Sequence, residues 1–375
     1  MASLLQLGMG WFTEEAGGLN RMYAGLYGAL LDDGVAVRGV IAGDPAVAGA
    51  TPPGLRFAAP RDALTLRRIV GFRRAVAAIL GEQAVDTVAA HFAPYALPVL
   101  DLIRDRRFVV HFHGPWAQES LAEHEAGAGV RIKRAVEQAV YSRADRFIVL
   151  SRAFGELLAR QYDAPMERIR VVPGGVDVGR FDVGASRAEA RERLGLPAAR
   201  RLVGVVRRLV HRMGVENLVD ALGAVRQRVP EVLLVIAGTG PLGDALCRRA
   251  AERGVADHVR FLGFVADRDL PLLYRACELT IVPSLALEGF GLTTIESLAA
   301  GTPVLVTPVG GLPETVVELD PRLVLAGSNP GALAAGLSAA LQGEMVLPTR
   351  DACVAYARAR FDWPIIARRT LAAYE

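Results

Sequence analysis

A glycine-rich loop with a glutamate on each side carries the most chemistry in this sequence. Glu288 precedes Gly289-Phe290-Gly291, and Glu296 lies within a helical pattern that begins near Thr293. The two glycines permit a sharp turn, and the free N–H groups at the start of a helix attract phosphate. The segment therefore predicts one carboxylate in a loop, a second carboxylate one turn into a helix, and an anion site between them.

Two histidines lie at the end of a strongly apolar strand pattern in the first half of the chain. The pattern covers Phe108–Phe112, and His113 follows it. Because side chains alternate along a strand, we expect His111 and His113 on one side and Phe112 on the other. His113 is the better candidate to bond a sugar hydroxyl or to assist proton transfer. A structural role is the alternative for His113 and the favoured interpretation of His91.

Candidate phosphate-binding groups follow two other predicted strands. Gly17-Gly18 opens a helical pattern, where backbone N–H groups can meet an anion, although a tight turn explains the glycines equally well. Arg207-Arg208 follows an apolar run, with Arg212 close behind. A guanidinium forms paired hydrogen bonds that suit a diphosphate. A solvent-exposed arginine pair is the alternative.

Short apolar runs alternate with amphipathic stretches along the whole chain, which indicates βα units and parallel sheets. The strands predicted in the first half are Ser3–Leu7, Ala36–Ile41, Thr87–Ala90, Phe108–Phe112 and Arg146–Leu150. Those in the second half are Arg201–Val206, Val232–Ala237, Val259–Leu262, Leu279–Val282, Pro303–Thr307 and Arg322–Leu325. The helical patterns between them include Gly18–Leu31, Leu64–Leu80, Tyr95–Arg104, Val215–Arg228 and Thr293–Ala300. Each half is therefore predicted to be a doubly wound α/β domain.

The domain boundary is expected in the stretch Val172–Pro197, which is rich in glycine and proline. We place one domain at residues 1–172 and the other at 173–355. The final helical segment, about 356–375, is expected to pack back on the first domain. Two such domains facing each other would form a deep cleft, and ligands bind beyond the carboxyl ends of parallel strands.

Composition excludes several classes of protein. The 375 residues are 52% hydrophobic and 22% charged, which fits a soluble globular protein rather than a disordered one. A net charge of +3 is too small to indicate a nucleic-acid partner. The three cysteines are far apart and form no metal-binding pattern, so we expect a reducing cytoplasmic location. No apolar run approaches the ~18 residues of a membrane span.

The ordered set of motifs resembles the family-4 retaining glycosyltransferases of the GT-B fold over essentially the whole chain. The matching segments are Gly17-Gly18, Phe112-His113-Gly114, Val171–Asp177, Arg207-Arg208-Leu209, Ala237–Pro241, Phe261-Leu262-Gly263, Glu288–Glu296 and Gly310–Glu314. The resemblance implies two Rossmann-like domains, with the acceptor on the first and a UDP- or GDP-linked sugar on the second. It implies a hexosyltransferase that needs no metal or other cofactor, with a glycan, lipid-linked or small-molecule acceptor.

The resemblance also implies residue roles. Arg208 would contact the diphosphate, Glu296 the ribose, and Glu288 the donor sugar, whereas His113 would lie near the reacting face of that sugar. The catalytic set is thus His113, Glu288 and Arg208. The donor-binding set is Gly17, Gly18, Arg208, Arg212, Gly263, Phe264, Val265, Glu288, Gly289, Phe290, Gly291, Leu292 and Glu296.

One position departs from the family pattern. The family usually has Lys-Gly where this chain has Met213-Gly214, so one cation expected on the diphosphate is absent there. Either Arg212 replaces it, or Arg208 and helix N-termini act with less help. An enzyme of a variant subgroup is favoured over an inactive homologue. Another activity on the same architecture, such as an epimerase, is the further alternative.

A basic amphipathic helix in the first half suggests a second kind of partner. The stretch Leu64–Leu80 places Leu66, Ile69 and Val70 among four arginines, a pattern that can dock on anionic lipid. An ordinary core helix with a solvated arginine face is the favoured alternative. Peripheral contact with the inner face of a membrane therefore stands as a hypothesis.

Overall fold

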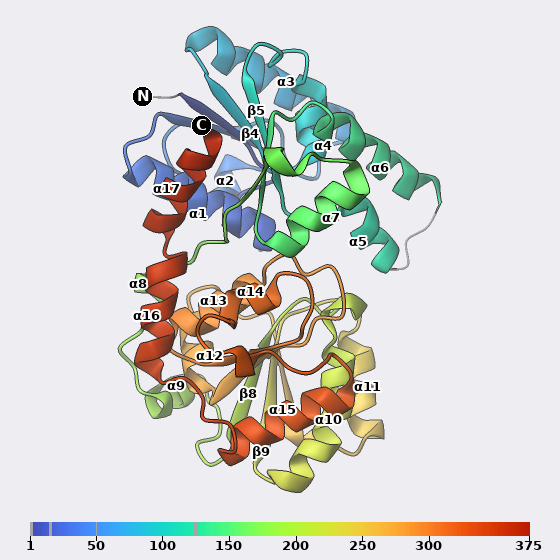
Figure 1. Ribbon diagram of the computed structural model, residues 1–375, viewed down its shortest axis with the longest axis vertical. Coiled ribbons are helices and arrows are strands. Elements are labelled where there is room, and N and C mark those ends of the chain that lie inside the picture. The colour runs from blue at the N-terminus through green and yellow to red at the C-terminus, as the bar shows by residue number, and fades with distance from the viewer. Residues whose placement is uncertain (1–2, 15–16, 50, 124–126) are drawn as a thin grey trace. The chain divides into compact units, whose positions relative to one another are not determined.

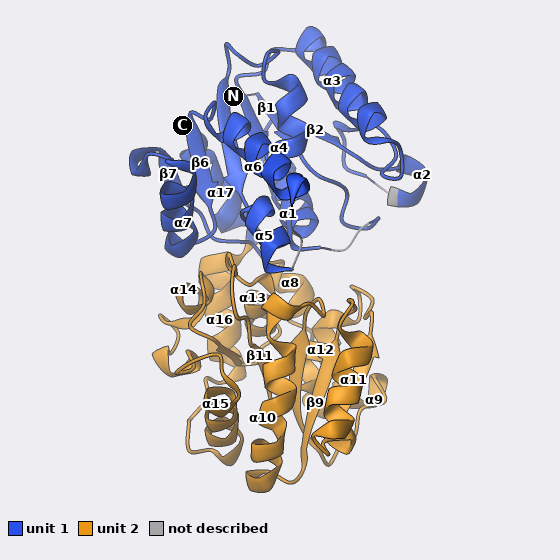
Figure 2. Cartoon of the chain, turned by 90° about the vertical axis from the view of Figure 1, so that its right-hand side faces the viewer, with its two compact units in different colours: residues 1–175, 363–375 blue, residues 176–362 orange. Residues whose placement is uncertain are grey.

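The computed structural model describes residues 3–14, 17–49, 51–123 and 127–375, which form two compact units. Unit 1 comprises Met1–Gly175 together with Trp363–Glu375, and unit 2 comprises Val176–Asp362 (Figure 2). The division between Gly175 and Val176 falls inside the glycine- and proline-rich stretch. Each unit is a parallel sheet with helices packed against it (Figure 1).

Unit 1 contains a seven-stranded parallel sheet in the order β3-β2-β1-β4-β5-β6-β7. Its strands are β1 (Leu4–Leu7), β2 (Val37–Ile41), β3 (Leu55–Phe57), β4 (Thr87–Ala90), β5 (Arg107–Phe112), β6 (Arg146–Val149) and β7 (Ile169–Val171). The five strands predicted in this half are confirmed to within one residue at each end. The two edge strands, β3 and β7, were not predicted, because each is three residues long and incompletely buried.

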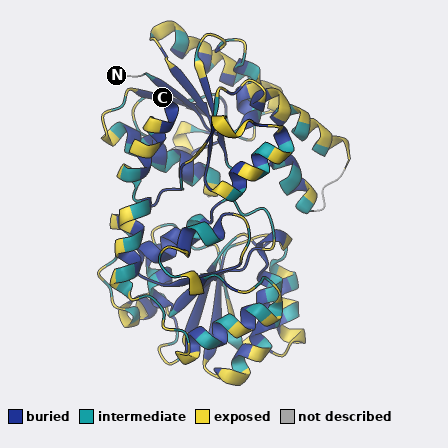
Figure 3. Ribbon diagram, viewed as in Figure 1, coloured by how far each residue is buried: buried dark blue, intermediate teal, exposed yellow. Residues whose placement is uncertain are grey.

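Helices cover both faces of this sheet. They are α1 (Gly18–Asp32), α2 (Pro45–Ala48), α3 (Thr65–Glu82), α4 (Ala93–Ala96), α5 (Trp116–Ala122), α6 (Ala128–Tyr141), α7 (Arg152–Tyr162) and α17 (Trp363–Tyr374), with 3₁₀ turns η1 (Leu97–Val99) and η2 (Met166–Arg168). One core lies between the sheet and α3, α6 and α7, and the other between the sheet and α1 and α17. The strands are the most buried part of the unit (Figure 3).

The predicted helix Tyr95–Arg104 is wrong as a single element. The chain forms the short helix α4, passes into η1 at Leu97, and continues as turns. Pro98 lies at the centre of the predicted helix. Proline lacks an N–H donor and its ring clashes with the preceding turn, so a continuous α-helix is interrupted there.

Helix α17 returns to unit 1 after the chain has completed unit 2. A Cβ atom on Gly25 or on Gly175 would collide with the indole ring of Trp363, so both positions leave room for that ring. Tyr374, at the other end of α17, is buried against the sheet. The first and last parts of the chain therefore share one core.

Unit 2 contains a five-stranded parallel sheet in the order β10-β9-β8-β11-β12. Its strands are β8 (Arg201–Val206), β9 (Val232–Ala237), β10 (Val259–Gly263), β11 (Leu279–Val282) and β12 (Val304–Val306). The sixth predicted strand, Arg322–Leu325, is wrong: a 3₁₀ turn occupies Pro321–Leu323, and a single bridge joins Val324 to Val306. Asp320 caps that turn and Pro321 begins it, which leaves too few residues for a strand.

The helices of unit 2 complete the doubly wound arrangement. They are α8 (Val178–Phe181), α9 (Arg187–Arg193), α10 (Val215–Arg228), α11 (Gly243–Glu252), α12 (Leu270–Ala276), α13 (Leu292–Ala299), α14 (Leu312–Val316), α15 (Pro330–Gln342) and α16 (Arg350–Phe361). The 3₁₀ turns are η3 (His211–Met213), η4 (Ala256–His258) and η5 (Pro321–Leu323). The helical segment at the end of the chain divides between α16 and α17 at Asp362, two residues before Pro364.

Candidate active site

Three histidines gather beyond the carboxyl ends of β4 and β5 in unit 1. The rings of His91 and His111 stack with centroids 4.0 Å apart, and Nδ1 of His91 lies 3.1 Å from Nε2 of His113. Nε2 of His111 lies 2.7 Å from the hydroxyl of Tyr374. Phe112 packs into the core on the opposite face of the sheet, so the predicted alternation is confirmed. His91, which was given a structural interpretation, directly contacts His113.

Burial holds all three imidazoles in the neutral state. Desolvation lowers the pKa of His113 to about 4 and lowers the pKa values of His91 and His111 well below their usual value. A neutral imidazole donates from one nitrogen and accepts at the other. In the pair His91–His113, one ring therefore donates and the other accepts, which fixes the orientation of the His113 ring.

This cluster is also the group of His, Cys, Asp and Glu side chains that most resembles a metal site among the described residues. Its three candidate ligand nitrogens lie within 4.8 Å of one another. Imidazole binds a metal in the plane of its ring, at about 2 Å. The three rings are nearly parallel, with interplanar angles of 14–22°, so their nitrogens do not converge on one point. This arrangement suits hydrogen bonding better than metal binding.

Gly17 and Gly18 lie where α1 begins, and both are exposed. The backbone of Gly17 is extended, with φ of 171°, and a Cβ atom there would meet nothing within 4 Å. The fold of unit 1 therefore does not require glycine at this position. A ligand that approaches the N–H groups of α1 closely would require it.

In unit 2, Glu288 and Arg207 form a buried ion pair. The Arg207 side chain is 6% exposed and that of Glu288 is 13% exposed. The same carboxylate accepts a hydrogen bond of 2.9 Å from Ser284. Burial alone would raise the pKa of Glu288. The charge and hydrogen bond of Arg207, the hydrogen bond of Ser284 and the charge of Arg212 outweigh burial and lower it. Glu288 is therefore an anion that orients Arg207.

Two glycines bring neighbouring loops against this pair. Gly214 has φ of 72°, and a Cβ atom there would collide with the carbonyl of Pro283. Gly310 has φ of 55°, and a Cβ atom there would collide with the carbonyl of Glu288. The N–H of Gly311 donates to the same carbonyl at 2.9 Å. The loops after β8, β11 and β12 thus fix the backbone that carries the ion pair.

Several donors in the segments that follow β8 and β11 have no protein partner. Nη1 of Arg207 and the hydroxyls of Thr293 and Thr294 are buried without a hydrogen bond. The two threonines lie in the first turn of α13. The first N–H groups of a helix lack acceptors within it, although that of Thr294 donates to the carbonyl of Gly291 at 2.9 Å. Buried donors of this kind normally have partners. Donors of this kind suit the oxygens of an anionic ligand.

The other sequence-predicted residues occupy different environments. Glu296 is 4% exposed and accepts a hydrogen bond of 2.8 Å from the buried Tyr274. Nη1 of Arg212 donates to the carbonyl of Leu287 at 3.3 Å, so this group braces a loop. Arg208 is exposed, whereas its neighbour Arg207 is buried.

Three further predicted residues, Gly263, Phe264 and Val265, lie at the end of the edge strand β10 and directly after it. The ring of Phe264 is 68% exposed, directly after Gly263, while Val265 is partly buried. In the Glu288–Glu296 loop, Phe290 packs against Phe361 and so serves the core of unit 2. Sequence reasoning missed the structural partners Tyr274 and Tyr374, since neither belongs to a motif.

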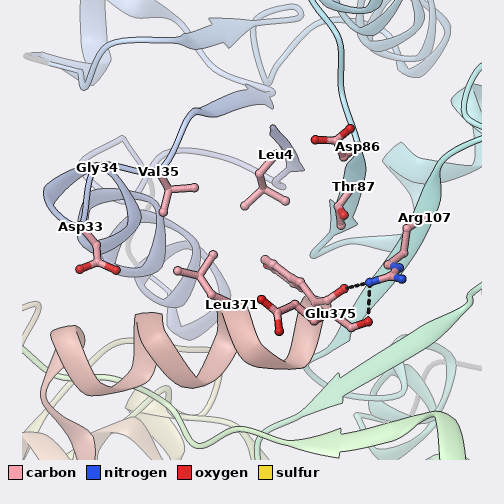
Figure 4. A pocket seen from close by; sticks show the side chains of 10 residues that line it. Leu4, Asp33, Gly34, Val35, Asp86, Thr87, Arg107, Leu371 and Glu375 are labelled. Atoms are coloured by element: carbon pink, nitrogen blue, oxygen red, sulfur yellow. Dashed lines mark hydrogen bonds between the residues drawn. The ribbon is translucent and has the colours of Figure 1, made fainter. Parts of the chain in front are cut away.

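A hollow of about 650 Å³ in unit 1 lies at the amino ends of the strands, opposite the ends that carry the histidines. Figure 4 shows Leu4, Thr87 and Arg107, which begin β1, β4 and β5, around it together with the end of α17. Arg107 donates from Nη1 to the carbonyls of Tyr374 and Glu375 at 2.5 and 2.6 Å (Figure 4). The hollow is separate from the candidate chemistry.

Comparison with known proteins decides the family. The family model "Glycosyltransferase Family 4" matches residues 16–180, and "Glycosyl transferases group 1" matches residues 186–360. A GDP-mannose-dependent α-(1-6)-phosphatidylinositol monomannoside mannosyltransferase of Mycolicibacterium smegmatis is 32% identical over 266 residues, 68% of this chain and 67% of the relative. The chain belongs to the family-4 glycosyltransferases. Its two parallel-sheet units give it the GT-B architecture.

A second relative is matched over a smaller part. A D-inositol 3-phosphate glycosyltransferase of Salinispora arenicola is 40% identical over 216 residues, 54% of this chain and 48% of the relative. The chain thus spans about half the length of this curated relative.

Solved structures show the same fold over the whole chain. Sucrose-phosphate synthase of Thermosynechococcus elongatus superposes with a TM-score of 0.79 at 24% identity, covering 99% of this chain and 98% of that one. HepE of Anabaena, solved with UDP and glucose, gives 0.78 at 21% identity, covering 99% of both chains. Among the described residues, no helix has the length and apolar content to cross a bilayer.

Proposed function

We propose that this family-4 protein transfers a hexose from a UDP- or GDP-linked sugar to an acceptor hydroxyl, with retention of anomeric configuration and without a metal. The single observation that carries the proposal is the group of unsatisfied donors in the segments that follow β8 and β11. Arg207 Nη1, the two threonine hydroxyls and the first N–H groups of α13 together suit the oxygens of a diphosphate.

The chemistry requires stabilisation of the leaving diphosphate. The bond between the anomeric carbon and the phosphate oxygen breaks, and its electron pair stays on that oxygen. Fixed donors aimed at this charge act in a desolvated site without reorganisation. Arg207 and the start of α13 would supply them, which is the role a metal ion has in other transferases. The acceptor oxygen bonds to the anomeric carbon, and its proton passes to the phosphate oxygen that leaves.

Arg207 also offers an explanation for Met213, which stands where the family usually has lysine. Nη2 of Arg207 contacts the sulfur of Met213. A lysine ammonium at this point would lie against the Arg207 guanidinium and be repelled by it. A neutral methionine is compatible with a buried arginine. We therefore assign the missing positive charge to Arg207 rather than to Arg212, which braces a loop.

The remaining donor contacts follow from position. Glu296, held by Tyr274, is proposed for the ribose hydroxyls, and the exposed ring of Phe264 for the face of the base. Glu288 is proposed to orient Arg207 and to face the sugar. Arg208 and, separately, the N–H groups at Gly17 and Gly18 are proposed as further phosphate-binding groups.

His113 is proposed to lie near the reacting face of the sugar. As a neutral imidazole fixed by His91, it can hydrogen-bond a sugar hydroxyl without placing a positive charge beside the anomeric carbon. That carbon gains positive charge in an oxocarbenium-like transition state. A neutral histidine is therefore better suited to this place than a protonated one.

The names of two relatives suggest the acceptor class. One acts on D-inositol 3-phosphate and the other on phosphatidylinositol monomannoside. Both acceptors carry an inositol ring with a phosphate ester. We therefore propose a hydroxyl of a phosphorylated inositol, free or lipid-linked, as the first acceptor to examine.

The test is a donor and acceptor screen with the full chain. UDP- and GDP-hexoses are incubated with and without D-inositol 3-phosphate or a phosphatidylinositol mannoside, with chelator present, and nucleotide release is measured. Acceptor-dependent release and an anomeric configuration unchanged from donor to product are expected. Epimerised donor without nucleotide release would support an epimerase, and binding without turnover an inactive homologue; either result would overturn the proposal.

Contact with anionic lipid is proposed for α3. Its buried side is formed by Phe72, Val76 and Ile79, while Leu64 is 82% exposed and Leu66 is 72% exposed. Exposed arginines, including Arg67 and Arg74, flank these leucines. Exposed leucines surrounded by arginines suit the surface of an anionic bilayer, because the leucines can enter the interface while the arginines contact lipid headgroups.

Vesicle co-sedimentation tests this contact. The wild type is expected to bind vesicles containing phosphatidylglycerol, and Leu66→Glu is expected to bind far less. Val346→Glu, which changes an apolar side chain 71% exposed in unit 2, is the matched control. Equal binding of Leu66→Glu and the wild type would remove α3 from the contact.

A further inference from the structure

A second cavity, in unit 2, lies at the amino ends of the strands, whereas the ion pair follows their carboxyl ends. It has a volume of about 280 Å³ and is lined by residues that begin strands rather than end them, including Arg201, Leu279 and Pro303. The loops that carry Arg207 and Glu288 leave the opposite ends of the same strands. The cavity is therefore separate from the proposed donor site.

Positive charge dominates this cavity. Its lining includes four arginines, Arg187, Arg201, Arg275 and Arg350, and one glutamate, Glu278. They come from the start of α9, the start of β8, the end of α12 and the start of α16. Four separate elements thus bring guanidinium groups to one hollow.

The nearby carboxylates are already engaged. Glu278 accepts two hydrogen bonds from the buried Arg191, at 2.7 and 2.8 Å, and a third from the N–H of Leu202 at 2.5 Å. Asp182 pairs with Arg350 at 2.5 Å and with Arg358 at 3.2 Å. Arg201 pairs with Glu231 at 3.5 Å, so Arg187 and Arg275 are left with the least carboxylate compensation in the cavity.

Arg187 and Arg275 are the least compensated of these cations. Arg187 approaches Glu278 only to 3.9 Å, and its Nε is buried without a hydrogen bond. Arg275 donates from Nε to the carbonyl of Ala185 at 3.0 Å, and no ion pair joins it to a carboxylate among the described residues. Burial, and then the charges of Arg350 and Arg187, lower the pKa of Arg275, although the charge of Asp182 opposes them. All three arginines line the same cavity.

Crowded guanidinium groups in a partly enclosed hollow attract an anion. Guanidinium groups form paired hydrogen bonds with phosphate oxygens, and partial desolvation strengthens them. The start of α16 adds backbone N–H groups, with Thr349 as its cap. The volume equals about nine water molecules at ~30 Å³ each, which is enough for a phosphate group and a small organic part. Leu341 and Leu347 supply an apolar wall for that part.

We propose that this cavity is a second anion site, which binds the phosphate group of inorganic phosphate or of a small phosphomonoester. The site is independent of the proposed transfer reaction. It lies within one unit, so it needs no particular arrangement of the two units.

The test measures thermal stabilisation of the full chain by inorganic phosphate and by glycerol phosphate, against chloride at the same ionic strength. Both anions are expected to raise the melting temperature of the wild type, and the anion with the larger shift identifies the preferred source. Arg187→Gln is chosen because it removes only the 3.9 Å ion pair. Its affinity for the anion is expected to fall about tenfold, since one charge-assisted hydrogen-bonding group is lost.

Two controls separate this cavity from other sites. Arg253→Gln removes a guanidinium of similar exposure from unit 2, outside the cavity, and should keep the wild-type shift. Arg207→Met removes any stabilisation that comes from the proposed donor site, at the opposite ends of the strands. The shift that remains in it should fall when Arg187→Gln is added. No shift in the wild type, an equal shift in Arg187→Gln, or loss of the shift in Arg207→Met alone would overturn the proposal.

Discussion

The two units bury polar groups beyond their strand ends by opposite means. In unit 1, His91, His111 and His113 are neutral because burial lowers their pKa values. In unit 2, Arg207 and Glu288 are both charged and compensate each other. The first arrangement presents hydrogen-bonding groups without charge, and the second holds a cation that has an unsatisfied donor of its own.

The difference matches what each half of a glycosyl transfer would need. A leaving diphosphate gains negative charge, so a held cation lowers the energy of its transition state. The reacting sugar gains positive charge, so neutral groups near it avoid repulsion. Under the proposed function, unit 2 would hold the nucleotide, and the neutral histidines of unit 1 would meet the sugar and acceptor hydroxyls.

The largest expected effect comes from removing the buried cation. Arg207→Met should lower kcat/KM for sugar transfer about a hundredfold or more, the range seen when a donor to a developing oxyanion is lost. Adding Met213→Lys to that variant should restore about tenfold, because an ammonium then replaces the lost charge. Met213→Lys alone should be harmful, since it places two cations together.

These three variants and the wild type form a cycle in steady-state kinetics. Arg208→Ala, at the exposed neighbour, is the matched control and should lose much less activity than Arg207→Met. The assignment fails if Arg208→Ala is the more damaging change, or if Met213→Lys has the same effect with and without Arg207.

A smaller effect concerns the neutral cluster. The pKa of His113 falls from about 6.5 in the unfolded chain to about 4 in the folded one, so only the unfolded state takes up a proton between those values. Stability is therefore complete above pH 6.5 and is lost as the pH falls toward 4. From pH 7 to pH 5, this histidine should lower the free energy of unfolding by about 2 kcal/mol.

Denaturant unfolding at several pH values checks this loss. His113→Gln should flatten the dependence on pH, whereas His211→Gln, which changes an exposed histidine, should leave it as in the wild type. An unchanged slope in His113→Gln would show that the cluster is not held neutral.

The smallest effect tests the support of the second glutamate. Tyr274→Phe removes the hydroxyl that donates to Glu296, which should raise the donor KM about fivefold, the equivalent of one hydrogen bond, and leave kcat nearly unchanged. Tyr356→Phe, whose hydroxyl is buried without a partner, is the control. A change in kcat without a change in KM would contradict a role in holding the nucleotide.

Much of the fold could be predicted from the sequence, because long apolar runs bounded by polar residues define buried parallel strands. The bounds of β8, β9, β11 and α10 agree with those predicted from these patterns. The short strands β3 and β7 lack such runs. The strand expected at Arg322–Leu325 failed because Asp320 and Pro321 set a turn first.

The site was less accessible to sequence reasoning. Arg207 and Arg208 directly follow β8, but strand alternation no longer applies beyond Val206, so the pattern could not say which arginine turns inward. Likewise, Tyr374 reaches His111 from 263 positions away, and only the path of α17 brings them together. Local spacing identified the loops, while side-chain direction depended on long-range packing.

The return of α17 to unit 1 also fixes an order of assembly during synthesis. The slot that Gly25 and Gly175 leave for Trp363 is complete once residue 175 has been made, yet the ring that fills it comes after all of unit 2. Domains generally fold as units while the chain emerges. Unit 2 can therefore finish folding first, and the earlier-made unit must wait, with part of its core uncovered, for the residues from 363 onward.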